Sequence, residues 1–426
     1  MVNKTVLKEI ILSNENFIVN KIQNLINRND INFPSGIKKV IVFYGVRRSG
    51  KTFILYDIFK KNNDVSLYID FEDERLVNFE IEDFEILKQI FFELKPHLVE
   101  KDCIFLFDEI QNVAGWEKFC RRIVEKEGIM VFVTGSSSKM MPFEIHTELR
   151  GRVWSSEVMP FSFTEYLKTK HIDPVDNTNY YTKKKAILKN FFKEYCTWGG
   201  FPEVVIAHND FERSKILKEY LNAMFFRDLT ERYNIKNLTL LEALSDKLFS
   251  SFSTKMSLSS FYKQYKDKFP FSKDMLFKYY KYFLNSMLVF EVRKLVESSY
   301  KRLRNPAKIY LIDIGLARKT TSSDVGRILE NLVFLYYKRK GYEIYYFHGT
   351  NECDFIIKKD NGSFLPIQVC YDLTEQNMPR ELTGLIEASK SVKSNEGLII
   401  TYDDEREMIV DGIHISIIPA WKFFFD

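Results

Sequence analysis

A glycine-containing turn between an apolar strand and an amphipathic segment constrains this chain most strongly. Residues 40–44 are apolar and partly β-branched, which predicts a buried strand, and Gly45 follows them. Gly50 comes after four more residues, and the apolar residues of 53–59 then recur at helical spacing. Glycines let backbone N–H groups approach an anion closely, and a new helix adds its own free N–H groups. The alternative is an ordinary strand-to-helix turn with glycines by chance, which the strand before it and the helix after it disfavour.

The turn also has the side chains that a phosphate chain needs. It matches the pattern G-x-x-x-x-G-K-[ST], in which Lys51 is expected to reach the β- and γ-phosphates and the Thr52 hydroxyl to bind Mg²⁺. The expected ligands are therefore ATP and Mg²⁺. The expected nucleotide-binding residues are consecutive: Gly45, Val46, Arg47, Arg48, Ser49, Gly50, Lys51, Thr52 and Phe53.

A second apolar strand, residues 103–107, ends in two acidic residues. Asp108 is expected to hold Mg²⁺, directly or through water, and Glu109 to polarise the attacking water. An earlier strand, 65–69, also ends in acidic residues, which indicates either a metal site or a solvated loop. The spacing of the three strands suits a parallel sheet with crossover helices, so the pattern predicts nucleoside triphosphate hydrolysis.

Two further roles are predicted downstream. A third strand, 129–133, is followed by Thr134 and Ser136, and either hydroxyl could sense the γ-phosphate; a polar strand end is the alternative. Arg152, and after it Arg150, is the expected arginine finger, acting in the same chain or from a neighbouring subunit. A surface ion pair is the alternative for these arginines.

A chain of 426 residues is too long for one ordinary core. The expected organisation is a P-loop domain with an N-terminal helix (1–165), a helical lid or linker (166–240), a winged-helix domain (241–300) and a C-terminal α/β domain (301–426). The winged helix is expected because three helical patterns precede a strand. Its third helix, 273–283, interleaves lysines with tyrosines, which indicates phosphate contacts or simply a solvated face.

The C-terminal part has the helix-and-strand order of metal-dependent nuclease cores. Glu330 and Asp354 occupy acidic positions, but Gln368 stands at the third acidic position and Cys370 at the lysine position. An amide is a weak ligand for a hard cation, and a thiol supplies no ammonium charge. We therefore predict a nuclease-like scaffold without cleavage activity, in which these four residues are vestigial.

Composition narrows the class of protein. The net charge of +4 neither demands nor excludes nucleic acid, and no apolar run approaches the length of a transmembrane helix. The N-terminus does not resemble a signal peptide. The five cysteines form no C-x-x-C, which predicts buried thiols in a reducing cytoplasm. The sequence is compatible with three kinds of partner: DNA, another protein and a second copy of the chain.

Together these motifs resemble a prokaryotic family of AAA+-type P-loop ATPases with a winged helix and a C-terminal restriction-endonuclease-like domain of unknown function. The resemblance covers nearly the whole chain. It rests on residues 45–52, 107–111, 133–137, 151–152, 160–165, 199–203, 352–355 and 367–371. It implies an α/β protein with a parallel-sheet core that binds and hydrolyses ATP. The segment Gln368-Val-Cys370 departs from the E-x-K of many nuclease-like relatives, which counts against cleavage.

The predicted function is a Mg²⁺-dependent ATPase that couples its nucleotide state to binding of DNA or a protein partner. The alternatives are an ATP-gated, metal-dependent DNA nuclease and a nucleotide-gated DNA-binding module with little turnover.

Overall fold

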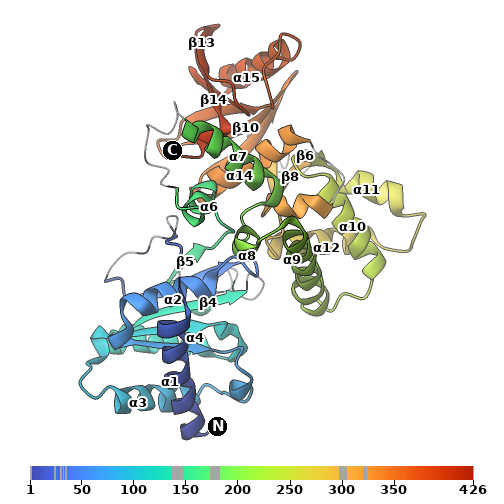
Figure 1. Ribbon diagram of the computed structural model, residues 1–426. Helices are drawn as coiled ribbons and strands as arrows, with labels where there is room; N and C mark the ends of the chain where they lie inside the picture. Colours follow the sequence, from blue (N-terminus) through green and yellow to red (C-terminus); the bar gives the residue numbers. More distant parts are fainter. Residues whose placement is uncertain are drawn as a thin grey trace. The chain divides into compact units, whose positions relative to one another are not determined.

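The computed structural model divides into two compact units, residues 1–159 and 160–426. Figure 1 labels the helices and strands of each unit. The first unit ends before the expected boundary at residue 165, and the lid, winged-helix and C-terminal parts fall together in the second. The structure describes residues 2–23, 25–28, 31, 33, 36–136, 140, 145, 147–172, 183–296, 305–319 and 324–425.

A five-stranded, fully parallel sheet forms the centre of the first unit, in the order β2-β3-β4-β1-β5. Its strands are β1 (Val40–Gly45), β2 (Ser66–Asp70), β3 (Ile104–Asp108), β4 (Met130–Ser136) and β5 (Val153–Glu157). This confirms the predicted parallel α/β core. Strand β4 lies between β1 and β3. Because all three strands are parallel, their carboxyl ends meet at one edge of the sheet.

Helices cover both faces of this sheet. They are α1 (Lys4–Lys21), α2 (Lys51–Lys61), α3 (Asp83–Leu94) and α4 (Trp116–Arg122), which continues into the π-helical turn η5 (Ile123–Glu127). Alternate strand residues explain the two layers. Ile41 and Phe43 pack with α2, whereas Val40 and Val42 join the core that α3 and α4 complete. The N-terminal helix was expected to run to residue 31 but ends at Lys21.

The second unit is built on a nine-stranded mixed sheet in the order β13-β14-β12-β11-β10-β9-β7-β8-β6. Its strands are β6 (Thr254–Met256), β7 (Val289–Lys294), β8 (Ala307–Leu311), β9 (Glu343–His348), β10 (Glu352–Lys358), β11 (Phe364–Val369), β12 (Glu396–Thr401), β13 (Arg406–Val410) and β14 (Ile413–Pro419). Short parallel pairing of β7 with β9 joins β6–β8 to the C-terminal strands. The expected boundary at residue 300 therefore cuts through one sheet.

Helices of the second unit surround this sheet and extend from it. They are α6 (Phe163–Thr169), α7 (Lys183–Trp198), α8 (Pro202–Ile206), α9 (Asp210–Ala223), the π-helical η7 (Met224–Glu231), α10 (Leu238–Ser250), α11 (Leu258–Tyr265), α12 (Lys273–Asn285), the 3-10 helix η8 (Ile314–Lys319), α14 (Val325–Arg339), α15 (Met378–Val392) and α16 (Ala420–Phe423). Strands β6 and β13 and helix α15 add to the elements expected from the sequence. Within the described part of the chain, no helix combines the length and apolar character that crossing a membrane requires.

Candidate functional site

The turn after β1 is shaped by two glycines that no other residue can replace without strain. Gly45 has a φ of 153°, and a Cβ at this position would lie 2.2 Å from the carbonyl oxygen of Val158. Gly50 has a φ of 96° and directly precedes α2. The loop therefore approaches its neighbouring chain more closely than a side chain allows, and it turns sharply into the helix.

Lys51, the first residue of α2, lies folded over this loop. Its ammonium group donates to the carbonyl oxygens of Gly45 (3.1 Å) and Val46 (3.0 Å), and the residue is only 5% exposed. The hydroxyl of Ser49 in the same loop is buried and has no hydrogen-bond partner among the described residues. A buried hydroxyl without a partner and a lysine at the loop carbonyls are what an anion in the loop would engage.

Arg28, from the segment before β1, supports the loop from outside. Its guanidinium donates to the carbonyl oxygen of Ser49 at 3.0 Å and to that of Met159 at 2.6 Å. Sequence reasoning missed this residue, because nothing in the sequence around it distinguishes it from a surface arginine.

The other expected nucleotide-binding residues surround the loop. Val46 is buried, Arg47 faces Glu72 at 3.8 Å, and Arg48 is exposed with a φ of 65°. Phe53, on the first turn of α2, is about half exposed. The structure thus places all nine expected residues in one continuous strand–loop–helix segment.

Asp108, the last residue of β3, is a buried carboxylate at the same edge. Its Oδ2 accepts from the Tyr68 hydroxyl at 3.1 Å, and its Oδ1 accepts from the Thr134 hydroxyl. Burial raises the pKa of Asp108, and hydrogen bonds from Thr134, Thr52 and Tyr68 oppose that shift. The structure therefore brings Thr52 of the loop and Thr134 of β4 to this carboxylate; their roles as metal ligand and sensor stay predictions.

A second carboxylate, Asp70, pairs in register with Asp108 on the adjacent strand. Its burial raises its pKa to about 7; the N–H of Glu72 opposes the shift, and the negative charge of Asp108 adds to it. Among the described residues, no group of three or more His, Cys, Asp or Glu side chains is arranged to hold a metal ion alone. Thr52 and Asp108 nevertheless offer the oxygen atoms that Mg²⁺ prefers when phosphates supply further ligands.

Glu109 follows in an unusual backbone conformation. Its φ of 48° and ψ of 42° are left-handed, and its N–H donates to the Thr134 hydroxyl at 3.1 Å. The side-chain amide of Gln111 donates to the Glu109 carboxylate. Gln111 is, after Arg28, the second residue of the site to which the sequence analysis gave no role. Left-handed backbone at a non-glycine residue is typical of functional sites.

Two predicted residues stand apart from this group. Arg152 precedes β5 at the edge opposite the loop, where its N–H groups face Glu125, and its side chain is 54% exposed. Because β1 runs six residues at about 3.3 Å each, Arg152 lies roughly 15–20 Å from the loop. The arginine-finger role within one chain therefore has no support in this geometry. The backbone of Ser136 pairs with Gly45, but its side chain falls outside what the structure describes.

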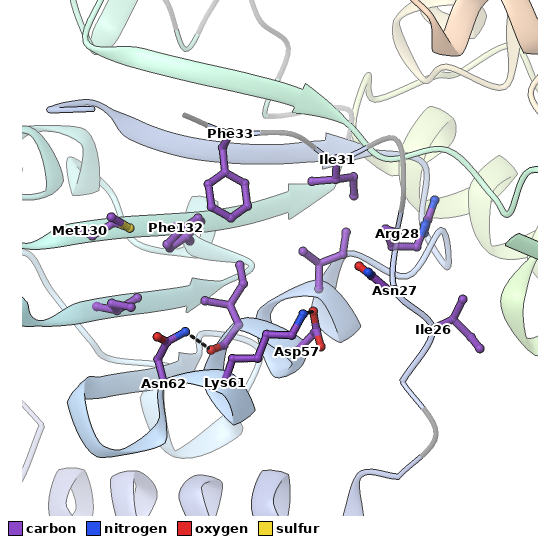
Figure 2. A pocket seen from close by; sticks show the side chains of 13 residues that line it. Ile26, Asn27, Arg28, Ile31, Phe33, Asp57, Lys61, Asn62, Met130 and Phe132 are labelled. Carbon is purple, nitrogen blue, oxygen red and sulfur yellow. Dashed lines mark hydrogen bonds and ion pairs between the residues drawn. The ribbon is translucent and has the colours of Figure 1, made fainter. Parts of the chain in front are cut away.

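A pocket of about 370 Å³ lies beside this site rather than in it (Figure 2). It is lined by α2 and by Ile104 and Met130, the first residues of β3 and β4, which lie at the edge opposite the loop. Asp57 and Lys61 of α2 form an ion pair on its wall. Arg28 lines the pocket and contacts Ser49, so it connects the pocket with the loop, as does α2 itself.

The second unit holds a different ionic cluster. Glu330 of α14 and Asp354 of β10, expected as vestigial nuclease residues, both bind the ammonium of Lys308 on β8. Burial raises the pKa of Glu330 to about 7, and the positive charge of Lys308 opposes that shift. Burial alone would lower the pKa of Lys308, but Asp354 and Glu330 raise it well above its usual value. Lys308 had no role in the sequence-based interpretation.

The other two vestigial residues do not touch this lysine in the described contacts. The Gln368 amide donates to Glu381 at 2.5 Å, and its oxygen accepts from the N–H of Asp354 at 3.3 Å. Cys370 is buried, and burial raises the pKa of its thiol to about 12. Neither side chain is placed to supply a metal ligand and a positive charge as the E-x-K pattern would.

Comparison with known sequences assigns the first unit. A family model described as an AAA domain matches residues 37–167, a range that contains the loop and all five strands. An uncharacterized protein of Methanocaldococcus jannaschii is 37% identical over 441 aligned positions, which cover 99% of this chain and 96% of that protein. The chain belongs to the same family as this protein. It carries an AAA domain, which indicates a nucleotide-binding ATPase.

The remainder of this AAA-domain protein matches two models described only as domains of unknown function, DUF8612 at 189–324 and DUF4143 at 325–423. An uncharacterized protein of Haemophilus influenzae is 26% identical over 97% of this chain and 99% of its own length. A solved structure of C. elegans PCH-2 aligns with 54% of this chain and 64% of that chain, at 12% identity and a TM-score of 0.26. That score is too low to support an argument.

Proposed function

We propose that this protein is a Mg²⁺-dependent ATPase whose catalytic centre is the loop edge of the five-stranded sheet. The observation that carries the proposal is the meeting of Lys51, Asp108 and Glu109 at that edge. Two separate segments of the chain supply these residues, and the AAA-domain match covers both of them.

The loop and α2 bind the phosphates in this proposal. Glycine N–H groups and the N-terminus of α2 face the anion, and Lys51 moves from the carbonyls of Gly45 and Val46 to the phosphate oxygens. Thr52 and Asp108 hold Mg²⁺, whose positive charge neutralises charge on the phosphates. Positive charge beside Asp108 would also offset the burial of that carboxylate.

Glu109 is the proposed general base. Its carboxylate accepts a hydrogen bond from Gln111, and its backbone is fixed by the contact of its N–H with Thr134. In this proposal Glu109 orients the attacking water and accepts its proton. The hydrogen bonds of Thr134 to Asp108 and Glu109 keep these two residues in fixed positions relative to each other.

The decisive experiment separates nucleotide binding from turnover. Glu109→Gln is expected to keep ATP binding, measured with a fluorescent ATP analogue, and to reduce turnover by about 10²-fold or more. Glu72→Gln, a nearby exposed carboxylate paired with Arg47, is the matched control and is expected to hydrolyse ATP normally. Unchanged turnover in Glu109→Gln would refute the proposed base.

A DNA-binding role for the second unit is supported by the topology around α12. The order α10-β6-α11-α12-β7-β8, with β8 pairing antiparallel to both β6 and β7, is compatible with the winged helix expected from the sequence and supports that proposal. Lys273, Lys278 and Lys281 are exposed on α12. Tyr279 and Tyr280 are buried, so the tyrosines belong mainly to the core and not to a base-stacking surface.

Fluorescence anisotropy with labelled duplex DNA tests this role. Lys278→Glu combined with Lys281→Glu is expected to weaken binding at least tenfold and to reduce its salt dependence. Lys390→Glu, an exposed lysine of α15 paired with Asp411, makes the same type of charge change elsewhere. An equal loss of DNA affinity in both variants would favour a nonspecific charge effect. No DNA binding by wild type would favour a protein partner.

The proposal of an ATP-gated nuclease has less support. Glu330 and Asp354 are buried and bound to Lys308, and Gln368 is bound to Glu381. In this arrangement the ammonium of Lys308 stands beside these carboxylates, where a metal ion would need to bind.

A further inference from the structure

The most unusual ionic group outside the ATPase site surrounds a buried lysine on β8, the strand next to the β6 edge of the nine-stranded sheet. The ammonium of Lys308 lies 3.0 Å from Glu330, 3.0 Å from Glu352 and 2.8 Å from Asp354. Lys308 is only 3% exposed. An ammonium group has three N–H donors, so these three carboxylates satisfy it completely.

Each carboxylate has a second hydrogen-bond donor. Glu330 Oε1 also accepts from the Tyr310 hydroxyl at 2.6 Å, and Asp354 Oδ2 accepts from the N–H of Val369 at 3.0 Å. Glu352 Oε2 accepts from Lys255 of β6 at 2.5 Å. The ring of His348 lies 3.7 Å from Glu352.

Two lysine charges offset most of the negative charge of this cluster. Three carboxylates face two ammonium groups, Lys308 inside the sheet and Lys255 at its margin. Without a cation, the buried Glu330 and Asp354 and the partly exposed Glu352 would repel one another strongly and would lose part of their hydration. In a metal-binding site a divalent ion provides this positive charge. In this sheet the lysine ammonium already stands between the carboxylate oxygens.

The two kinds of charge come from different parts of the sequence. Both lysines lie in the segment that matches DUF8612, and all three carboxylates lie in the segment that matches DUF4143. The cluster therefore links the two segments at the point where β7 and β9 join their strands into one sheet.

We propose that the Lys308 ammonium is the resident cation of this carboxylate site: it takes the position of a divalent metal ion and fastens the DUF8612 segment to the DUF4143 segment. The site binds no divalent metal while Lys308 is in place. Loss of the lysine charge converts the site into a divalent-cation site. This inference is independent of the proposed ATPase activity.

Manganese binding to the full-length protein without nucleotide tests the proposal. Free Mn²⁺ is measured by electron paramagnetic resonance for wild type, Asp354→Asn, Lys308→Gln, and Lys308→Gln combined with Asp354→Asn. Lys308→Gln keeps much of the side-chain length and removes the charge. We expect Lys308→Gln to bind one more Mn²⁺ than wild type, and we expect the double variant to lose that ion. Wild type and Asp354→Asn are expected to bind the same number of Mn²⁺ ions. Binding at the loop edge contributes equally to all four proteins.

Two results would overturn the proposal. The first is Mn²⁺ binding by wild type that Asp354→Asn removes, because the carboxylates would then accept a metal with Lys308 present. The second is a folded Lys308→Gln protein with no additional Mn²⁺. Circular dichroism establishes folding of each variant. The wild-type and Asp354→Asn comparison stands without Lys308→Gln, so an unfolded lysine variant does not remove the test.

Discussion

Each unit of this protein places carboxylates beside a lysine on a β-sheet, but the two arrangements are opposite. In the first unit, the ammonium of Lys51 binds the loop carbonyls of Gly45 and Val46, and Asp108 accepts from the hydroxyls of Tyr68 and Thr134. In the second unit, Lys308 contacts three carboxylates directly. The first arrangement leaves Asp108 for a cation and Lys51 for an anion, which suits a site that exchanges ligands.

The second arrangement lacks that freedom. A lysine surrounded by its full set of acceptors has no donor left for a substrate, and its carboxylates have little capacity left for a metal. The difference teaches that acidic residues in a sheet do not define a metal site; the location of the nearest cation decides. Each prediction below changes one charge or hydroxyl group that the comparison depends on.

The largest effect is expected from Lys51→Ala. Loss of the ammonium removes the main positive charge that this chain offers to the phosphates, so ATP turnover should fall by about 10³-fold. Lys61→Ala on the same helix is the control, since Lys61 forms an exposed pair with Asp57 and should change turnover little. A steady-state phosphate-release assay measures both. Comparable turnover in Lys51→Ala and wild type would remove the ATPase interpretation.

The next largest effect is expected from Lys308→Ala, on stability. Removing one partner of a buried ionic group leaves uncompensated charge, so the free energy of unfolding of the second unit should fall by about 3 kcal/mol. Lys255→Ala should cost about 1 kcal/mol or less, because Lys255 is partly exposed and contacts Glu352 alone among the three carboxylates. Denaturant unfolding followed by circular dichroism measures both variants. Equal losses would mean that Lys308 has no special place in the cluster.

Thr134→Val tests how the first site is held together. The hydroxyl donates to Asp108 and accepts from the N–H of Glu109, so its loss leaves both groups without that partner. Hydrogen bonds to charged groups contribute about 1.5–3 kcal/mol, which corresponds to a fall in turnover of about 10–10²-fold. Thr134→Ser keeps the hydroxyl and should stay within a few-fold of wild type. Similar activity of the valine and serine variants would show that the hydroxyl is not needed.

Asp313 of the second unit, a buried carboxylate, predicts how the stability of the fold depends on pH. Asp313 accepts from the N–H groups of Gly200 (2.7 Å) and Gly315 (2.8 Å), and its burial raises its pKa to about 7. Because the folded pKa lies above the unfolded value, Asp313 stabilises the fold below about pH 4, and that contribution disappears as the pH rises through 7.

The measurement is the unfolding free energy of wild type and Asp313→Asn between pH 6 and pH 8. Wild type should lose about 1 kcal/mol more than the variant over this interval, because only wild type has the ionisable side chain. Glu330 also titrates near pH 7 but is present in both proteins, so the difference isolates Asp313. Parallel pH profiles would mean that Asp313 does not ionise in this range.

Local patterns in the sequence predicted the first unit well. Strand, glycine turn and helix around residues 40–59 follow from apolar periodicity and from the conformational freedom of glycine, and the structure has them at β1 and α2. The carboxyl ends of parallel strands meet at one edge, so Asp108 and Thr134 could be grouped with the turn before the structure was known. Gln111 and Arg28 were missed because their contacts depend on loop geometry, which no periodic pattern encodes.

The second unit was predicted less well, since its organisation depends on long-range pairing. The short pairing of β7 with β9 joins segments that were expected to be separate domains, and no local sequence pattern predicts this pairing. Lys308 stands in the apolar strand 307–311 and had no role in the sequence-based interpretation. Only the contacts with strand β10 and helix α14, which supply its three carboxylates, show why a lysine is buried there.

The smallest effect is expected from Arg152→Ala, and it depends on protein concentration. In one chain Arg152 lies at the edge of the sheet opposite the loop and forms an exposed pair with Glu125, so its loss should change stability by less than about 1 kcal/mol. Turnover in dilute solution should match wild type. A finger supplied by a neighbouring subunit would lower the turnover of Arg152→Ala only where wild-type turnover per chain rises with concentration. Glu125→Ala breaks the same ion pair and keeps the arginine. If turnover falls in Arg152→Ala alone, the arginine acts in the site of the neighbouring subunit. If turnover falls equally in both variants, the ion pair of Arg152 with Glu125 stabilises the fold of its own unit.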